Sequence, residues 1–152
     1  MSFLLDEMNK VIKAFDAHGV EYAVCGGLAM GIQGFPRATM DIDLLIRQES
    51  LDNALKIAGE LGFDIRGLDI SFKDPKVEIR RVSKIINGVV LRLDLLLVFD
   101  EIEEVWRTKE ALPYLGQTIF VVSRDGLIVL KRRADRPQGR ADIYRIENEE
   151  ED

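Results

Sequence analysis

Three aspartates stand in segments whose other residues are mostly apolar. Asp41 and Asp43 lie one residue apart in an expected strand over 40–46, and Asp94 lies in the apolar run 91–98. Because successive strand residues project to opposite faces, Asp41 and Asp43 share a face and their apolar neighbours point to the other. Burying like charges side by side is costly unless a cation neutralises them. The three carboxylates therefore predict a divalent-metal site for phosphate chemistry.

A pair of glycines precedes these carboxylates at an expected strand-to-helix turn. Gly26 and Gly27 follow the expected strand 21–25, and thirteen residues, 28–40, separate them from Asp41. Glycine lets backbone N–H groups approach a phosphate closely, and a helix N-terminus adds partial positive charge. A glycine pair or an Asp-x-Asp pair alone is common in turns and solvated loops. Their combination with a third aspartate is far more specific.

The composition is that of one globular domain. The chain has 152 residues, and we expect a single domain over 1–146 followed by a disordered acidic tail over 147–152. No apolar run approaches the roughly 20 residues that span a bilayer. The N-terminus is acidic and lacks the basic region of a secretory signal. The single cysteine, Cys25, excludes an internal disulfide. These features predict a cytoplasmic protein.

The net charge of −6 hides a basic segment before the acidic tail. Between residues 124 and 145, seven basic residues stand against three aspartates. A local positive surface of this kind keeps anionic ligands compatible with an acidic chain. The basic residues are Arg124, Lys131, Arg132, Arg133, Arg136, Arg140 and Arg145.

The order of expected elements indicates the fold class. Ser50 and Ser123 are expected to cap the helices that follow them, and Asn87-Gly88 is a strong hairpin signal. Residues 63–70 are expected to form a strand and a turn. Helices that alternate with strands around a central hairpin predict an α/β (α+β) fold with a mixed β-sheet flanked by helices. The expected helices are 2–18, 28–33, 50–61, 101–108, 123–134 and 139–147, and the further strands are 77–86, 89–98 and 117–122.

The constellation of Gly26, Gly27, Asp41, Asp43 and Asp94 resembles the signature of the nucleotidyltransferase superfamily typified by DNA polymerase β. That signature has an apolar residue, a glycine followed by Gly or Ser, a spacer, Asp-x-Asp/Glu on a strand, and a third carboxylate on a neighbouring strand. The resemblance covers most of residues 21–146 and is specific at the three aspartates. It implies the nucleotidyltransferase fold.

Two further stretches are similar to the small prokaryotic branch of this superfamily, which includes abortive-infection and toxin–antitoxin nucleotidyltransferases. The first is the sequence at 37–45, Arg-Ala-Thr-Met-Asp-Ile-Asp-Leu-Leu. The second is the order of Lys131, Arg136 and Asp142, which is similar to a Lys…Arg…Asp series of that branch. On the residues alone, a solvated helix face is the default interpretation of Lys131 and Arg136, and only the resemblance favours a functional role for Lys131. Asp142 is expected to pair with Lys131 or Arg145.

The resemblance implies a two-metal phosphoryl transfer. Asp41 and Asp43 would hold two Mg²⁺ ions, one of which binds a nucleoside triphosphate (NTP). The other ion would lower the pKa of an acceptor hydroxyl, with Asp94 as its ligand and candidate general base. The product would be a nucleoside monophosphate joined to the acceptor, with pyrophosphate released.

The resemblance also implies a phosphate subsite. Gly26 and Gly27 would cradle the β- and γ-phosphates, and Arg37 and Lys131 would neutralise charge that develops toward pyrophosphate. Arg37 reads equally as a solvated loop charge. Trp106 is expected to pack in the interior, although an aromatic near a pocket can also stack on a base.

The acceptor is not identified by the sequence. RNA, a protein or a small hydroxylated molecule fits, recognised by a partner subunit, by a second copy in a homodimer, or by the basic segment. Surface carboxylates on an exposed strand, or a site that binds ligand without catalysis, are competing interpretations. The alternative function is a non-catalytic binding partner with the nucleotidyltransferase fold, such as a component of a toxin–antitoxin pair.

Overall fold

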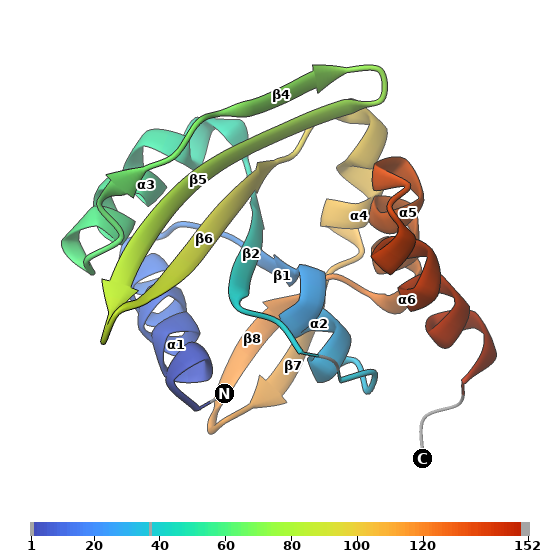
Figure 1. The fold of residues 1–152 in the computed structure, drawn as a ribbon, viewed down its shortest axis with the longest axis horizontal. Coiled ribbons are helices and arrows are strands. Elements are labelled where there is room, and N and C mark those ends of the chain that lie inside the picture. Colours follow the sequence, from blue (N-terminus) through green and yellow to red (C-terminus); the bar gives the residue numbers. More distant parts are fainter. Residues whose placement is uncertain (1, 37, 150–152) are drawn as a thin grey trace.

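The computed structural model describes residues 2–36 and 38–149, in which eight strands form one mixed sheet flanked by helices (Figure 1). This confirms the predicted fold class. The helices are α1 (Ser2–Ala17), α2 (Gly26–Ile32), α3 (Leu51–Glu60), α4 (Glu103–Arg107), α5 (Arg124–Ala134) and α6 (Pro137–Asn148). The strands are β1 (Ala23–Cys25), β2 (Asp41–Ile46), β3 (Ile65–Arg66), β4 (Ile70–Lys73), β5 (Lys76–Ile86), β6 (Val89–Leu97), β7 (Glu110–Tyr114) and β8 (Gln117–Val121).

Neighbouring strands in the sheet follow the order β3-β5-β6-β2-β1-β8-β7. β4 is not part of this series and pairs with β5. β2 is parallel to β6 and antiparallel to β1, while β5 and β6 form the hairpin predicted at Asn87-Gly88. Both turn residues have positive φ, 50° and 78°, as a two-residue hairpin turn requires. The centre of the sheet is therefore the β6-β2-β1 group.

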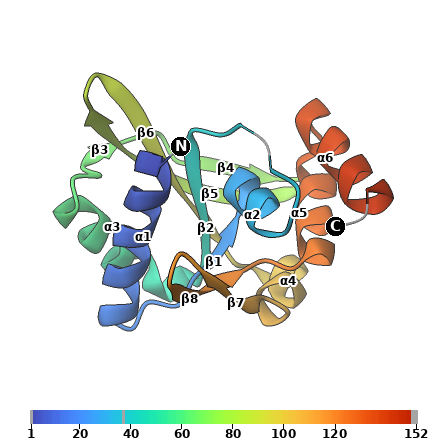
Figure 2. The ribbon, with the colours of Figure 1, turned by 90° about the horizontal axis from the view of Figure 1, so that it is seen from below.

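The two faces of this centre have different coverings. Alternate residues of β2 and β6, such as Ile42 and Leu93, are fully buried on the face that meets α1 and α3. Lys84 of β5 reaches the same side, where its amine donates to Glu7 of α1 and to the Leu61 carbonyl directly after α3. Figure 2 shows α2, α5 and α6 on the other side of β2.

Several element boundaries differ from the sequence-based expectation. Ser50 is not a helix cap: it lies in the 3₁₀ turn Gln48–Ser50, has helical backbone angles and makes no capping bond. Ser123 does cap α5, because its hydroxyl accepts the Gly126 N–H at 3.0 Å. Residues 63–70 contain β3 and the first residue of β4, and β7 was not expected at all because Pro113 weakens its strand signal.

The C-terminal helix is longer than expected. α6 begins at Pro137, whose fixed φ suits the first turn of a helix, and it extends to Asn148. The expected tail at 147–152 thus starts within the helix, and its residues 150–152 lie outside the described residues. No helix in the described part of the chain combines the length and the apolar character needed to cross a bilayer.

Candidate functional site

The register of β2 and β6 places the three predicted carboxylates on one face of the sheet. The strands are parallel, with Asp43 beside Asp94 and Asp41 beside Arg92. Residues paired in this way point to the same side of the sheet. Here this is the side of α2, because a Cβ at Gly26 of α2 would meet the Asp43 carboxylate, and Figure 2 shows α5 and α6 on that side of β2 as well. Asp94 is only 5% exposed, and Asp41 and Asp43 are partly buried. Three negative groups therefore gather where the sheet is shielded from much of the solvent.

The glycine pair packs directly on this site. α2 starts at Gly26, whose φ of +66° lies in the left-handed region, immediately after Cys25, the residue paired with Asp43. A Cβ at Gly26 would collide with the Asp43 carboxylate, and a Cβ at Gly27 would lie 2.8 Å from the Cβ of Thr39. The absence of side chains at both positions lets the carboxylate and the loop before β2 approach the first turn of α2.

Asp43 is in an unfavourable environment for a negative charge. Burial, followed by the charges of Asp94 and Asp41, raises its pKa to about 7, while Lys131 and Arg136 act in the opposite direction. Within residues 2–36 and 38–149, no side chain forms an ion pair or hydrogen bond with the Asp43 carboxylate. A bound cation would favour the ionised form of this group.

Asp94 and Asp41 differ from Asp43 because each has an arginine partner. Arg81 donates from Nε to Oδ1 of Asp94 at 2.7 Å and from Nη2 to Oδ2 at 2.9 Å. Arg92 forms a longer ion pair with Asp41, at 3.5 Å between Nη1 and Oδ1. The two-pronged Arg81 contact is the stronger geometry, because both carboxylate oxygens are bonded.

Arg81 is a site residue that was not predicted from the sequence, although the signal for it was available. The two-residue turn at Asn87-Gly88 pairs Ile86 with Val89. Counting outward from that pair sets Arg81 directly opposite Asp94, as the structure has it. The register of the predicted hairpin therefore already pairs Arg81 with Asp94.

Lys131 lies across from Asp43 and is held by a buried partner. Its amine is 2.9 Å from Oδ2 of Asp142, and the two side chains are 11% and 1% exposed. Gln138 donates to the other carboxylate oxygen, Oδ1, at 2.9 Å. The expectation that Asp142 is an ion-pair partner of Lys131 is thus confirmed. The pair fixes a cation near the carboxylate site and ties α5 to α6.

Two further residues singled out from the sequence are Arg37 and Trp106. Arg37, the expected phosphate contact before β2, lies outside the described residues. Trp106 is 4% exposed, and the Lys109 amine lies 3.9 Å from the centre of its ring. Its role here is packing, as expected.

The donor set fits a Mg²⁺ ion at Asp41 and Asp43. Within the described residues, no three Asp, Glu, His or Cys side chains converge as a ready metal-binding group. Both Asp94 oxygens are bonded to Arg81, which leaves the carboxylates of Asp41 and Asp43 as donors. Mg²⁺ is commonly bound by one or two carboxylates together with substrate phosphates. The raised pKa of Asp43 fits this assignment, because burial and two neighbouring carboxylates disfavour its negative charge and a bound cation would favour it.

Comparisons with known proteins give matches among solved structures only. No protein-family model and no curated protein matches the sequence. A candidate nucleotidyltransferase of Thermotoga maritima aligns over 96% of this chain and 93% of its own, with 18% identity and a TM-score of 0.67. The antibiotic-resistance factor ANT(2'')-Ia, in complex with adenylyl-2''-tobramycin, aligns over 91% of this chain and 84% of its own, with 20% identity and a TM-score of 0.62.

A third solved structure is that of the lincosamide antibiotic adenylyltransferase LnuA with lincomycin bound. It aligns over 94% of this chain and 96% of its own, with 14% identity and a TM-score of 0.65. The TM-scores establish a shared fold, and the low identities leave the substrate open. The chain has the fold of the nucleotidyltransferase superfamily.

Proposed function

We propose that the chain is a cytoplasmic, Mg²⁺-dependent nucleotidyltransferase that moves a nucleoside monophosphate from an NTP to an acceptor hydroxyl. The observation that carries the proposal is the buried carboxylate cluster on the β2–β6 face. Asp43 stands in register with Asp94 against the glycine turn and has no cation partner among the described residues. A cluster of buried carboxylates does not stabilise a fold unless a bound ligand compensates the negative charge.

The residues divide into a nucleotide side and an acceptor side. Asp41 and Asp43 would hold the divalent ion, which when bound supplies Lewis-acid stabilisation to the triphosphate. Gly26 and Gly27 would place backbone N–H groups against the phosphates. Lys131, fixed by Asp142, lies where it lowers the pKa of Asp43 and could offset charge on the departing pyrophosphate.

The proposed reaction is a displacement at the α-phosphorus. The acceptor oxygen bonds to this phosphorus, the bond to the bridging oxygen of the β-phosphate breaks, and pyrophosphate leaves. Asp94 is proposed to accept the hydroxyl proton. Arg37 is proposed as a further phosphate contact. Transfer of this kind depends mainly on positioning and charge stabilisation, which a rigid strand pair can supply.

Small hydroxylated molecules are the first acceptor class to test. Two of the solved structures with this fold contain such molecules, adenylyl-2''-tobramycin and lincomycin. RNA and protein acceptors, and recognition through a partner subunit or a homodimer, are the next classes. The basic residues of α5 and α6 favour anionic acceptors among these.

Calorimetric titration of the four NTPs with Mg²⁺ tests the proposal. Wild-type protein should bind at least one NTP only when Mg²⁺ is present, and Asp41→Asn and Asp43→Asn should abolish this binding. Asp64→Asn removes an exposed carboxylate outside the site and should leave binding unchanged. If the wild type binds none of the four NTPs, the proposal is wrong.

One observation favours the alternative, a non-catalytic binding partner such as a toxin–antitoxin component. Two of the three carboxylates already have arginine partners, and a protein that only uses the fold as a scaffold needs no metal. In that case, Asp41→Asn and Asp43→Asn would leave the complex with its partner protein intact. A pull-down that compares these variants with the wild type would separate the two functions.

A further inference from the structure

Arg81 is held in place along its whole length. The backbone N–H of Gly67 donates to the Arg81 carbonyl at 2.9 Å. A Cβ at Gly67 would lie 3.2 Å from Cγ and 3.3 Å from Cβ of Arg81, so the glycine packs closely on the side-chain stem. The guanidinium then reaches both oxygens of Asp94. The side chain therefore has a fixed path from backbone to carboxylate.

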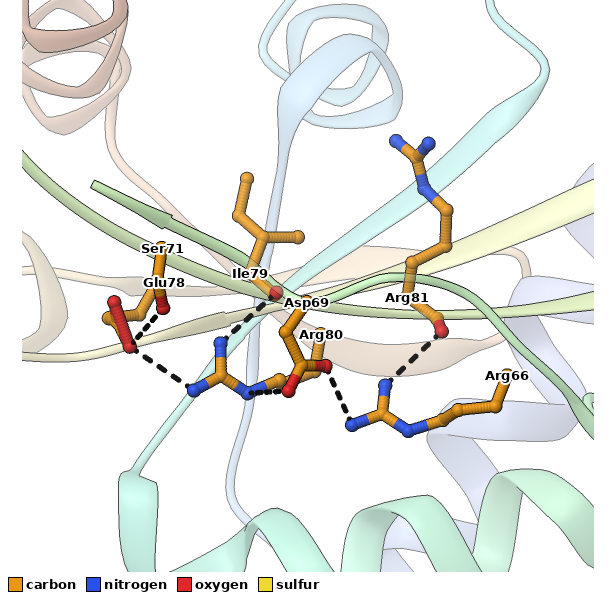
Figure 3. A network of polar contacts seen from close by, with 7 residues as sticks. All are labelled: Arg66, Asp69, Ser71, Glu78, Ile79, Arg80 and Arg81. Carbon is orange, nitrogen blue, oxygen red and sulfur yellow. Dashed lines mark hydrogen bonds and ion pairs between the residues drawn. The ribbon is translucent and has the colours of Figure 1, made fainter.

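A polar network fixes the segment that carries Gly67 (Figure 3). Arg66 contacts Asp69 at 2.8 Å, and Asp69 contacts Arg80 of β5 at 3.4 Å. Arg66 also donates to the Arg81 carbonyl at 3.3 Å. In Figure 3, Arg80 and Arg81 extend to opposite sides of β5. The network thus anchors the Arg81 backbone from one side, while its guanidinium is directed to Asp94 on the other.

We propose that Arg81 replaces the second divalent ion of the site, so that the nucleotide-bound protein holds one ion, through Asp41 and Asp43. This inference rests on the proposed function. A second ion would need an oxygen of Asp94, and Arg81 bonds both of them. Asp94 is 5% exposed, so an ion could not bind it from the solvent without displacing the guanidinium.

The charges of the two halves of the site support this division. On the Asp94 half, the positive charge of Arg81 already compensates the carboxylate, and a divalent ion there would meet the guanidinium at close range. On the other half, Asp43 has no cation bonded to it among the described residues. Arg81 is thereby a positioning residue: it holds both oxygens of the Asp94 carboxylate in place without a metal.

Counting bound Mn²⁺ tests this inference. Electron paramagnetic resonance measures free Mn²⁺ during a titration of protein saturated with α,β-methylene-ATP, an analogue that cannot transfer its nucleotide. We expect one protein-bound ion for the wild type and two for Arg81→Gln. Arg107→Gln is the control, because it removes an exposed arginine of α4 that takes no part in the carboxylate site or in the network around Arg81, and it should bind one ion. Arg81→Gln with Asp94→Asn should return to one.

The outcomes separate the inference from the function on which it rests. Two ions in the wild type would overturn the inference and leave the proposed function intact. One ion in both the wild type and Arg81→Gln would also overturn it, provided that circular dichroism shows the variant folded. The number of Mn²⁺ ions bound by the wild type tests the inference even if Arg81→Gln does not fold. Binding of neither analogue nor metal would contradict the proposed function, and the inference with it.

Discussion

The two faces of the β2–β6 pair are made from alternate residues of the same strands, yet their chemistry is opposite. On the face toward α1 and α3, residues such as Leu44, Leu93 and Leu95 are fully buried among other apolar side chains. On the face toward α2 and α5, Asp43 and Asp94 lie side by side in the same register. Burial on the first face stabilises the fold, whereas burial on the second costs free energy.

The buried apolar side chains stabilise the strand pair, whereas Asp43 opposes its stability. Replacing Asp43 by a neutral group should therefore bring a gain in stability. Asp94 and Asp41 have arginine partners, whereas Asp43 forms no ion pair with a side chain of the described residues. A buried carboxylate that opposes stability in this way is typical of a binding or catalytic site. Neutralising Asp43 and truncating a buried residue of the apolar face should therefore change stability in opposite directions.

Removing the positive charge of Lys131, near the face that carries Asp43 and Asp94, should have the largest effect on the free energy of unfolding. Lys131→Met removes the amine that lies 2.9 Å from Oδ2 of Asp142, whose side chain is 1% exposed. Breaking a buried ion pair in this way typically costs about 3 to 5 kcal/mol. Urea unfolding should show such a loss, and Lys131→Met with Asp142→Leu should recover much of it. A loss below about 1 kcal/mol would mean that the pair contributes little to α5–α6 packing.

Truncation on the apolar face should destabilise by a comparable or smaller amount. Leu93 is fully buried, and Leu93→Ala leaves a cavity between the sheet and its helices. The expected loss in the free energy of unfolding is about 2 to 5 kcal/mol. Val90 lies on the same strand and is 46% exposed, so Val90→Ala should stay within about 0.5 kcal/mol. Equal losses for the two variants would contradict the assignment of the faces.

Much of this division could be predicted from the sequence. The alternation in Asp41-Ile42-Asp43 placed both carboxylates on one face, and Asn87-Gly88 fixed the hairpin. These signals are local, since a strand alternates with a period of two and a two-residue turn sets its own register. The same register places Arg81 opposite Asp94, so that contact was predictable although it was not predicted.

The remaining features depend on packing between distant segments. The pairing of Asp43 with Asp94 joins two parallel strands, and no turn between them sets their register. The collision between a Cβ at Gly26 and Asp43 depends on how α2 packs over β2. The short strand β7 lies at the edge of the sheet, where Pro113 is tolerated and the strand pattern is weak. Such features need the tertiary structure.

On the charged face, neutralising Asp43 should stabilise the protein in a pH-dependent way. Its folded-state pKa of about 7 lies above the ordinary value of 3.8, so the stability from its bound proton is present at low pH and lost as the pH rises through 7. In metal-free buffer, Asp43→Asn should therefore become more stable relative to the wild type by about 2 kcal/mol between pH 5 and pH 8. Urea unfolding at both pH values checks this.

The exposed Asp64→Asn variant is the control for this pH series, and its stability should follow that of the wild type. Added Mg²⁺ should reduce the advantage of Asp43→Asn at pH 8, because the ion binds the ionised wild-type site. A difference between variant and wild type that is the same at pH 5 and pH 8 would show that Asp43 titrates normally in the folded protein.

The smallest effect should come from an arginine–carboxylate pair outside both faces. Arg132 and Glu147 join α5 to α6 at 2.9 Å, the distance found between Lys131 and Asp142, but their side chains are 62% and 45% exposed. Solvent screens such a pair, so Arg132→Ala should change the free energy of unfolding by less than about 1 kcal/mol. If urea unfolding showed a loss as large as that of Lys131→Met, distance alone would govern these pairs. A small loss would show that burial makes the charges around the carboxylate site matter.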